Sequence, residues 1–229
     1  MSARLRAGTL ALAVWMSLSL GDAGAATPAR ADTLIVPAGK RARVDGVARP
    51  GEWADADTLE IQAGPDWMVP VLLKHDGEAL YVAFSNLVHG REERYPEVML
   101  DVAGNGGGWD DNDWWLHVSN LDCTGRGFYG VYGHTCAPDA EAWYANNFPL
   151  WSKRAIEIRV SLGLVGLSPD RSGALPVFGL ALAVAESESR SFGARPGRER
   201  RFLWPLTATM TPGSWAPARL APIPPRSEP

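Results

Sequence analysis

Short segments with alternating apolar and polar residues, or with a brief apolar run, recur along most of the sequence. They have the length and the β-branched or aromatic content that is typical of strands, and they are residues 69–75, 79–85, 96–102, 113–119, 155–162 and 177–186. Glycine, proline and aspartate separate them, and no long segment has the helical period of about 3.6 residues. This pattern predicts an all-β fold, an antiparallel β-sandwich of two sheets with a jelly-roll or immunoglobulin-like architecture.

The alternation also assigns faces, because side chains two positions apart lie on the same side of a sheet. Trp114 shares its face with Leu116, so we predict that it lies in the core and that Trp115 lies on the opposite face. If the six segments form one sheet, its second face carries a mixture of charged and aromatic residues. These are Tyr81, Glu97, Met99, Asp101, Trp115, His117, Glu157 and Arg159. Such a face is either a binding groove or an ordinary solvated surface.

The first residues have the composition of an export signal. Arg4 and Arg6 precede an apolar stretch at residues 7–20, and small-residue cleavage patterns end at Ala25 and at Ala31. We therefore expect residues 1–25, or as far as 31, to be a signal peptide, and the protein to be periplasmic or secreted. A buried first helix is the alternative. Residues 32–221 are then the sandwich domain, and residues 222–229 (PIPPRSEP) a disordered tail.

Charge and cysteine content narrow the class of partner. The formal net charge is −4 and no basic run is present, which argues against nucleic acid as a partner. No segment is apolar for long enough to insert into a membrane. Cys123 and Cys136 are expected to form a disulfide in an oxidising compartment, with a reactive free thiol as the alternative.

An acidic, glycine-rich loop between two predicted strands offers oxygen ligands for Ca²⁺. Its candidate ligands are Asp101, Asn105, Asp110, Asp111 and Asp113. Their spacing does not match the EF-hand loop. The alternative is a hairpin loop in which the Asp and Asn side chains cap backbone amides. The four histidines lack the spacing of a zinc or copper site.

Four segments, in this order along the chain, resemble the family 9 carbohydrate-binding modules and their wider β-sandwich superfamily. They are VDGVARPGEWADAD (residues 44–57), VLLKHDGEALYVAFS (71–85), PEVMLDVAGN (96–105) and LWPLTATMTPGSWAPARL (203–220). Modules of this family are non-catalytic and hold a terminal sugar between two tryptophans, among charged and amide side chains. Some also carry structural calcium.

The resemblance implies roles for particular residues. Glu97 matches the strand glutamate that contacts sugar hydroxyls, and Trp215 matches the C-terminal tryptophan of the clamp. The sequence departs from the family where the other tryptophan is expected, since Arg91 and Tyr95 stand near that place. The glutamine that the family has on a late strand falls in the apolar run 178–185.

Sugars present flat apolar C–H faces and many hydroxyls, so they are bound by aromatic platforms together with charged and amide groups. We expect a non-catalytic module that binds an oligo- or polysaccharide. A secreted enzyme or an envelope protein is a further expected partner. The predicted ligand-binding residues are Glu97, Trp115, Arg159 and Trp215, with Trp109, Trp143 and Asn146 in support. Each aromatic residue could instead pack a loop onto the sandwich.

Other classes of function have less support. No motif of a nucleophilic hydrolase, metalloprotease or phosphate-binding loop is present. Glu97 and Asp101 would be about 13 Å apart along one strand, which is too far for a glycosidase pair. The first alternative is a haem b electron-transfer domain, with Met68, Met99 and Lys74 as candidate ligands. The second is an adaptor domain without a small-molecule ligand.

Overall fold

The computed structural model describes residues 32–118, 123–125, 131–133, 143–145, 155–168, 175–186 and 200–224. The chain divides into two units, residues 1–30 and 31–229, and every described residue belongs to the second unit. The expected signal peptide, Cys136 and Asn146 lie outside the described residues, so export and the disulfide stay predictions. Of the helices in the described part, none has the length and hydropathy needed to cross a membrane.

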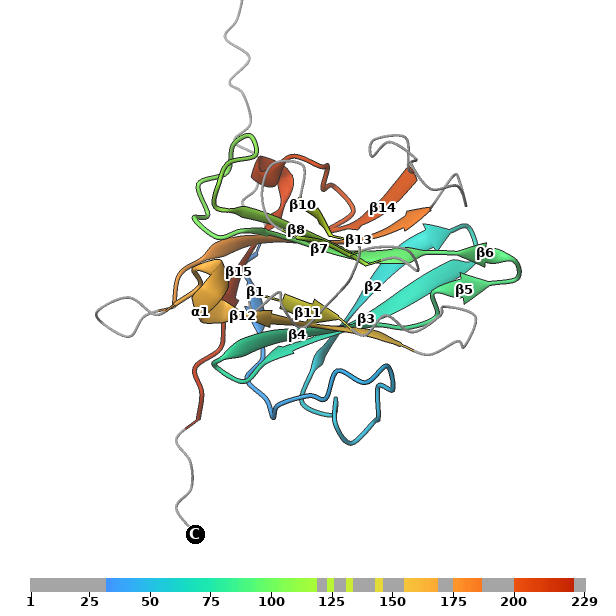
Figure 1. Cartoon of the computed structure of the whole chain (residues 1–229), viewed down its shortest axis with the longest axis horizontal. Coiled ribbons are helices and arrows are strands. Elements are labelled where there is room, and N and C mark those ends of the chain that lie inside the picture. The colour runs from blue at the N-terminus through green and yellow to red at the C-terminus, as the bar shows by residue number, and fades with distance from the viewer. Residues whose placement is uncertain are drawn as a thin grey trace, which may run out of the picture. The chain divides into compact units, whose positions relative to one another are not determined.

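Two sheets make up the fold (Figure 1). Neighbouring strands of the larger sheet are, in order, β1 (Leu34–Val36), β15 (Ala216–Leu220), β13 (Phe178–Glu186), β7 (Tyr95–Asp101), β8 (Asp113–Val118), β9 (Cys123–Gly125) and β10 (Val131–Gly133). An eighth strand, β14 (Arg200–Trp204), pairs with the end of β13, beyond the part that pairs with β15. The pairing is antiparallel apart from β1 with β15, which is parallel. The prediction of an antiparallel sandwich did not include this parallel pair.

The smaller sheet has five strands. Their order is β11 (Trp143–Ala145), β12 (Ile156–Ser161), β4 (Ala79–Phe84), β3 (Trp67–His75) and β2 (Asp57–Gly64). Strands β5 (Val88–His89) and β6 (Glu92–Glu93) form a separate hairpin. The described helices are short, namely α1 (Leu162–Val165) and the 3₁₀ turn η2 (Pro212–Ser214). The all-β, two-sheet prediction is thus confirmed.

Apolar side chains from alternate strand positions fill the space between the sheets. The fully buried ones include Val71, Leu73, Val82, Phe84, Val98, Leu100, Leu116, Ile158, Val160, Leu180 and Leu182. Trp114 belongs to this core, whereas Trp115 packs in a separate cluster on the other side of its sheet. The predicted facing of the two adjacent tryptophans is therefore confirmed.

Each outer face is covered by a segment from one end of the described chain (Figure 1). The N-terminal cover, residues 41–56, packs Ala42 and Trp53 on the five-stranded sheet. The C-terminal cover, residues 205–215, packs Met210 and Trp215 on the eight-stranded sheet. Alanines on the strands beneath, such as Ala83 and Ala181, give room for these side chains. Both outer faces therefore carry a small apolar layer of their own.

Candidate functional site

Four of the predicted binding residues come together on the outer face of the eight-stranded sheet. Glu97 lies on β7, Trp115 on β8, Trp215 just before β15, and Trp109 in the loop before β8. The register places Met99 opposite Trp115 on one side and opposite Ala181 on the other. Ala181 on β13 is small, so it leaves room on this face for the indole rings of Trp115 and Trp215. Glu97 and Trp115 therefore share a face as the alternation predicted, and Trp109 and Trp215 lie on the same face.

The three tryptophans form one aromatic cluster. The ring centroids of Trp109 and Trp215 are 5.1 Å apart with an edge-on geometry, and those of Trp109 and Trp115 are 6.3 Å apart. Trp109 donates from Nε1 to the Met210 carbonyl at 2.6 Å, and Trp215 donates to the Thr209 carbonyl at 3.0 Å. Trp215 is only 6% exposed. It therefore packs, as part of the C-terminal cover, against Trp109 and does not stand open as one wall of a clamp.

Glu97 is fully buried on this face and forms an ion pair with Arg201 of β14. The Arg201 Nε donates to both carboxylate oxygens, at 2.9 and 3.1 Å. The Arg201 guanidinium also lies over the Trp115 ring, 4.9 Å from its centroid. Sequence reasoning missed Arg201. Its signal was the alternation in RRFLW, where Phe202 faces the core and Leu203 faces the outer cluster.

Arg159 is a correction to the predicted site. It lies on β12 of the five-stranded sheet, where it pairs with Tyr81 of β4, and Glu157 lies two residues before it. These residues face outward as predicted, but on the opposite side of the sandwich from Glu97. The condition under which these residues would share one face, that all six segments form a single sheet, is therefore not met. Trp143 also belongs to the five-stranded sheet, since it pairs with Val160.

The acidic loop is ordered by hydrogen bonds to its own backbone. Asp101 accepts from the Gly106 amide at 3.0 Å, and Asp110 accepts from the Asn112 amide and from the Asn105 side chain at 2.8 and 2.7 Å. Such contacts are expected for the alternative to a calcium site, a hairpin loop whose Asp and Asn side chains cap backbone amides. Among the described residues, no group of three His, Cys, Asp or Glu side chains is gathered in a way that could hold a metal. Calcium binding at this loop remains a prediction without support from this geometry.

Asp113 has the most perturbed carboxyl of this loop. It is fully buried, and its Oδ2 accepts from the Asp110 amide at 2.8 Å. Burial raises the pKa of Asp113 to about 6, and the charges of Asp110 and Asp101 add to the increase in pKa. The Asp110 amide acts in the opposite direction on this pKa. The ionised Asp113 carboxylate therefore destabilises the folded protein at neutral pH.

The candidate haem ligands are separated by the fold. Met99 lies on the outer face of the eight-stranded sheet. Lys74 lies on the outer face of the five-stranded sheet, where its Nζ is bound to Asp55 at 2.7 Å. The hydrophobic core lies between them. Met68 is six residues before Lys74 on the same strand, about 20 Å away. These residues therefore do not form an axial pair.

Comparison with known proteins places the fold. No protein-family model matches the sequence, and no curated protein is similar to it in sequence. Among solved structures, a family 9 carbohydrate-binding module from Caldicellulosiruptor kristjanssonii in complex with glucose superposes with a TM-score of 0.56 at 15% identity. The match covers 86% of this chain and 100% of the module. The chain has the fold of the family 9 carbohydrate-binding modules.

A second structure of a family 9 module from that organism, in complex with cellotriose, superposes with a TM-score of 0.54 at 15% identity. This superposition covers 84% of this chain and 100% of the module. The predicted resemblance in fold is thus confirmed. On this family 9 fold, the predicted binding residues divide between two outer faces. The outer face with Glu97 carries a carboxylate, a guanidinium and three indoles. Its aromatic cluster is larger than that of the other outer face, where Trp53 and Tyr81 lie.

Proposed function

We propose that this protein is an exported, non-catalytic carbohydrate-binding module whose sugar binds on the outer face of the eight-stranded sheet. The observation that carries the proposal is the Glu97–Arg201 ion pair, held above the Trp115 indole with Trp109 beside it. The family 9 fold supports it, since structures with this fold contain glucose and cellotriose.

The chemistry of this face suits a sugar. A carboxylate accepts hydrogen bonds from hydroxyls and a guanidinium donates to them, and such charge-assisted bonds are stronger than neutral ones. The indole faces supply apolar surface for the C–H side of the ring. Because Glu97 and Arg201 hold each other in place and Trp115 packs against Arg201, little side-chain entropy is lost on binding. Trp109, only partly buried, is the indole through which a sugar would reach the cluster.

Binding is tested by isothermal titration of the purified mature protein with glucose and cello-oligosaccharides. Glu97→Gln should lower the affinity about 10- to 100-fold, because a hydrogen bond to a charged group contributes about 1.5–3 kcal/mol. Trp109→Ala should also weaken binding. The matched control is Glu157→Gln, which alters an equally buried carboxylate on the other sheet and should leave sugar affinity unchanged.

The outcomes separate the parts of the proposal. If Glu157→Gln, and not Glu97→Gln, removes binding, the sugar binds on the other face. If no sugar of the series binds, the proposed function is wrong. Export is tested separately by expressing the full chain in a bacterium and sequencing the N-terminus of the periplasmic or secreted product. A mature protein beginning near residue 26 or 32 would support export, whereas retention of Met1 in the cytoplasm would oppose it.

A further inference from the structure

The outer face of the five-stranded sheet carries a second group of charged residues. A pocket of about 390 Å³ lies between the N-terminal cover and β12, and its lining is basic. The lining residues are Arg41, Ala42, Arg43, Val44 and Arg159. Three of these five carry a guanidinium and none carries a carboxylate. The proposed sugar site lies on the opposite side of the sandwich and uses none of them.

The wall of this pocket is fixed by Glu157, the buried carboxylate next to Arg159 on the same face of β12. Glu157 accepts from the amides of Asp45 and Gly46 at 2.9 and 2.7 Å, and from the Trp53 indole at 3.1 Å. Gly46 adopts a positive φ of 81°, which lets the cover turn onto this carboxylate. Because Glu157 is committed to these donors, the turn that lines the pocket is anchored to the sheet.

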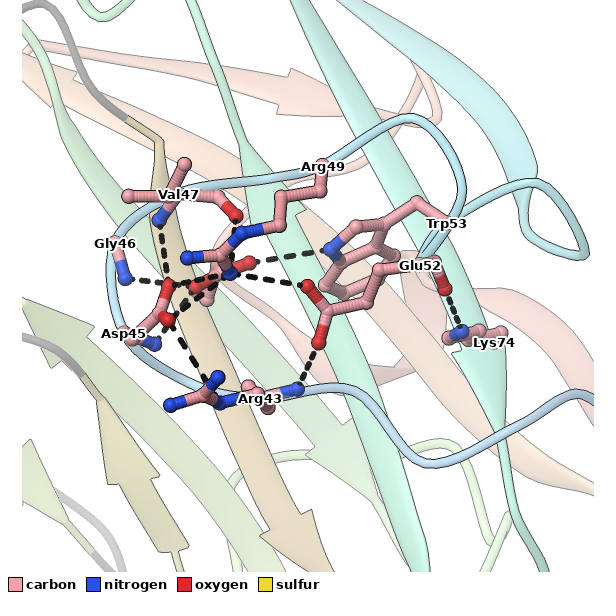
Figure 2. A network of polar contacts seen from close by, with 9 residues as sticks. Arg43, Asp45, Gly46, Val47, Arg49, Glu52, Trp53 and Lys74 are labelled. Carbon is pink, nitrogen blue, oxygen red and sulfur yellow. Dashed lines mark hydrogen bonds and ion pairs between the residues drawn. The ribbon is translucent and has the colours of Figure 1, made fainter.

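The acidic side chains of the cover are also committed (Figure 2). The Asp45 carboxylate accepts from the Arg49 guanidinium at 2.9 Å and from the Val47 amide at 3.1 Å. Glu52 accepts from the Arg43 amide and lies 3.5 Å from Arg49. The Arg43 side chain is 79% exposed, and its Nε is 3.8 Å from Asp45, a loose contact. Asp45 and Glu52 are therefore engaged mainly within the cover, while the Asp76 carboxylate interacts electrostatically with Arg41.

Arg159 is the basic group at the base of the pocket. It pairs across the strands with Tyr81 of β4, whose hydroxyl donates to Asp76 at 2.7 Å. Burial raises the pKa of Tyr81 to about 12, so the phenol stays neutral and does not neutralise Arg159. The Arg159 Nε is buried, and no hydrogen-bond partner for it is found in the described part of the chain. A buried guanidinium donor without a partner is costly unless an acceptor is supplied.

We propose that this pocket binds an oxyanion carried on a sugar-sized molecule, the carboxylate of a uronic acid. A planar guanidinium matches a carboxylate in a two-bond geometry, and Arg159 would supply these bonds from the base of the pocket. Arg41 and Arg43 add positive charge at the rim. The pocket has enough volume for a monosaccharide, and a bare anion would not fill it. This inference does not depend on the sugar site at Glu97.

The test is isothermal titration of the mature protein at low ionic strength with glucuronate, glucose, acetate and phosphate. Glucuronate should bind more tightly than glucose or acetate, with an affinity that falls as salt is added. Arg159→Met should weaken glucuronate binding about 10- to 100-fold. Arg43→Met, a change at an exposed side chain that leaves folding intact, should weaken it about 2- to 5-fold.

The matched control is Arg219→Met, which removes an exposed arginine from β15 of the other sheet and should change nothing. Thermal melts establish that each variant is folded. Equal binding to wild type and Arg159→Met, or no binding of any anion, would overturn the proposal. Tighter binding of phosphate than of glucuronate would overturn the acidic sugar as occupant. Glu97→Gln should leave glucuronate binding intact, which separates this site from the proposed glucose site.

Discussion

Asp113→Asn is the substitution that best isolates the electrostatics of the acidic loop. Asp113 is fully buried, and its Oδ1 has no hydrogen-bond partner among the described residues. Its Oδ2 accepts from the Asp110 amide at 2.8 Å. Asparagine has the same shape and keeps an oxygen for that amide, so the exchange removes the negative charge and places an NH2 group where Oδ1 lies. Burial and the charges of Asp110 and Asp101 are the reasons that this charge is unfavourable.

The sign and size follow from the pKa of Asp113, which is about 6 in the folded protein against 3.8 for an ordinary aspartate. Below about pH 4, both the folded and the unfolded chain hold the proton, so the carboxyl imposes no penalty. Between pH 4 and 6 the unfolded chain releases it first, so stability falls as pH rises. Above pH 6 the penalty is complete, with an upper limit of about 3 kcal/mol at roughly 1.4 kcal/mol per pKa unit.

The assay is urea unfolding followed by tryptophan fluorescence, at pH 4 and pH 7.5, in EDTA. Asp113→Asn should be more stable than wild type by about 1–3 kcal/mol at pH 7.5, and the difference should shrink to about 0.5 kcal/mol at pH 4. In thermal melts the gain corresponds to roughly 2–12 °C for a domain of this size. The matched control is Asp111→Asn, which removes the same charge from an exposed neighbour and should show neither effect.

A lower stability of Asp113→Asn than wild type at pH 7.5 in EDTA would refute this reasoning. Repeating the pH 7.5 measurement in calcium also tests the predicted metal loop. A bound Ca²⁺ would stabilise wild type, and loss of a ligand in Asp113→Asn would remove that gain. If calcium changes neither protein, the loop is held by its capping hydrogen bonds alone.

Two further predictions concern packing. Trp114→Ala should lower the free energy of unfolding by about 3–5 kcal/mol and Trp115→Ala by about 2–4 kcal/mol. Both side chains are only 9% exposed, although they lie on opposite faces of the sheet. Chemical denaturation measures both losses, and a near-zero loss for Trp115→Ala would contradict the packing of Trp115 against Arg201. Gly104→Ala should cost about 2 kcal/mol or more, since Gly104 has a φ of 59° and an added Cβ would lie 2.5 Å from the Val177 carbonyl oxygen. Gly107→Ala, which meets nothing within 4 Å, is the control and should be nearly neutral in the same thermal melt.

The small expected difference between the two tryptophans corrects one sequence-based expectation. Alternation alone places Trp115 on the second face, where we expect it to contact the ligand. The structure places it in a covered cluster with Trp109 and Trp215. Alternation tells which side of a strand a residue occupies but not whether that side is open. The C-terminal cover, more than 90 residues away in sequence, decides this.

Strand positions were predictable because each depends on a local pattern. The segments around Leu80, Val98, Ile158 and Leu180 alternate or run apolar over six or more residues, and all form strands. Strand β2 was missed although Leu59, Ile61 and Ala63 alternate with polar residues, a signal that was readable. Strands β14 and β15 lie in a region rich in proline and arginine, where the local pattern is weaker.

Strand partners were not predictable in this way. The pairing of β7 with β13 joins Met99 to Ala181, and that of β4 with β12 joins Tyr81 to Arg159. Nothing in one strand's alternation identifies a partner about 80 residues away. This is why Arg159 was grouped with Glu97 although they lie on different sheets. Register between distant strands is set by the whole core, which a local pattern does not contain.

Glu97 and Glu157, one buried glutamate on the outer face of each sheet, show how each face holds its polar groups in place. Burying a charge costs several kcal/mol unless donors satisfy it, so Glu97 and Glu157 each require partners from outside their own strand. Glu97 finds Arg201 on β14, and Glu157 finds the amides and the indole of the N-terminal cover. Each pairing fixes polar groups beside a carboxylate on a rigid sheet. Loss of the Arg201 guanidinium should therefore destabilise the protein, because it leaves the buried Glu97 carboxylate without this partner, and loss of the cover contacts should do the same at Glu157.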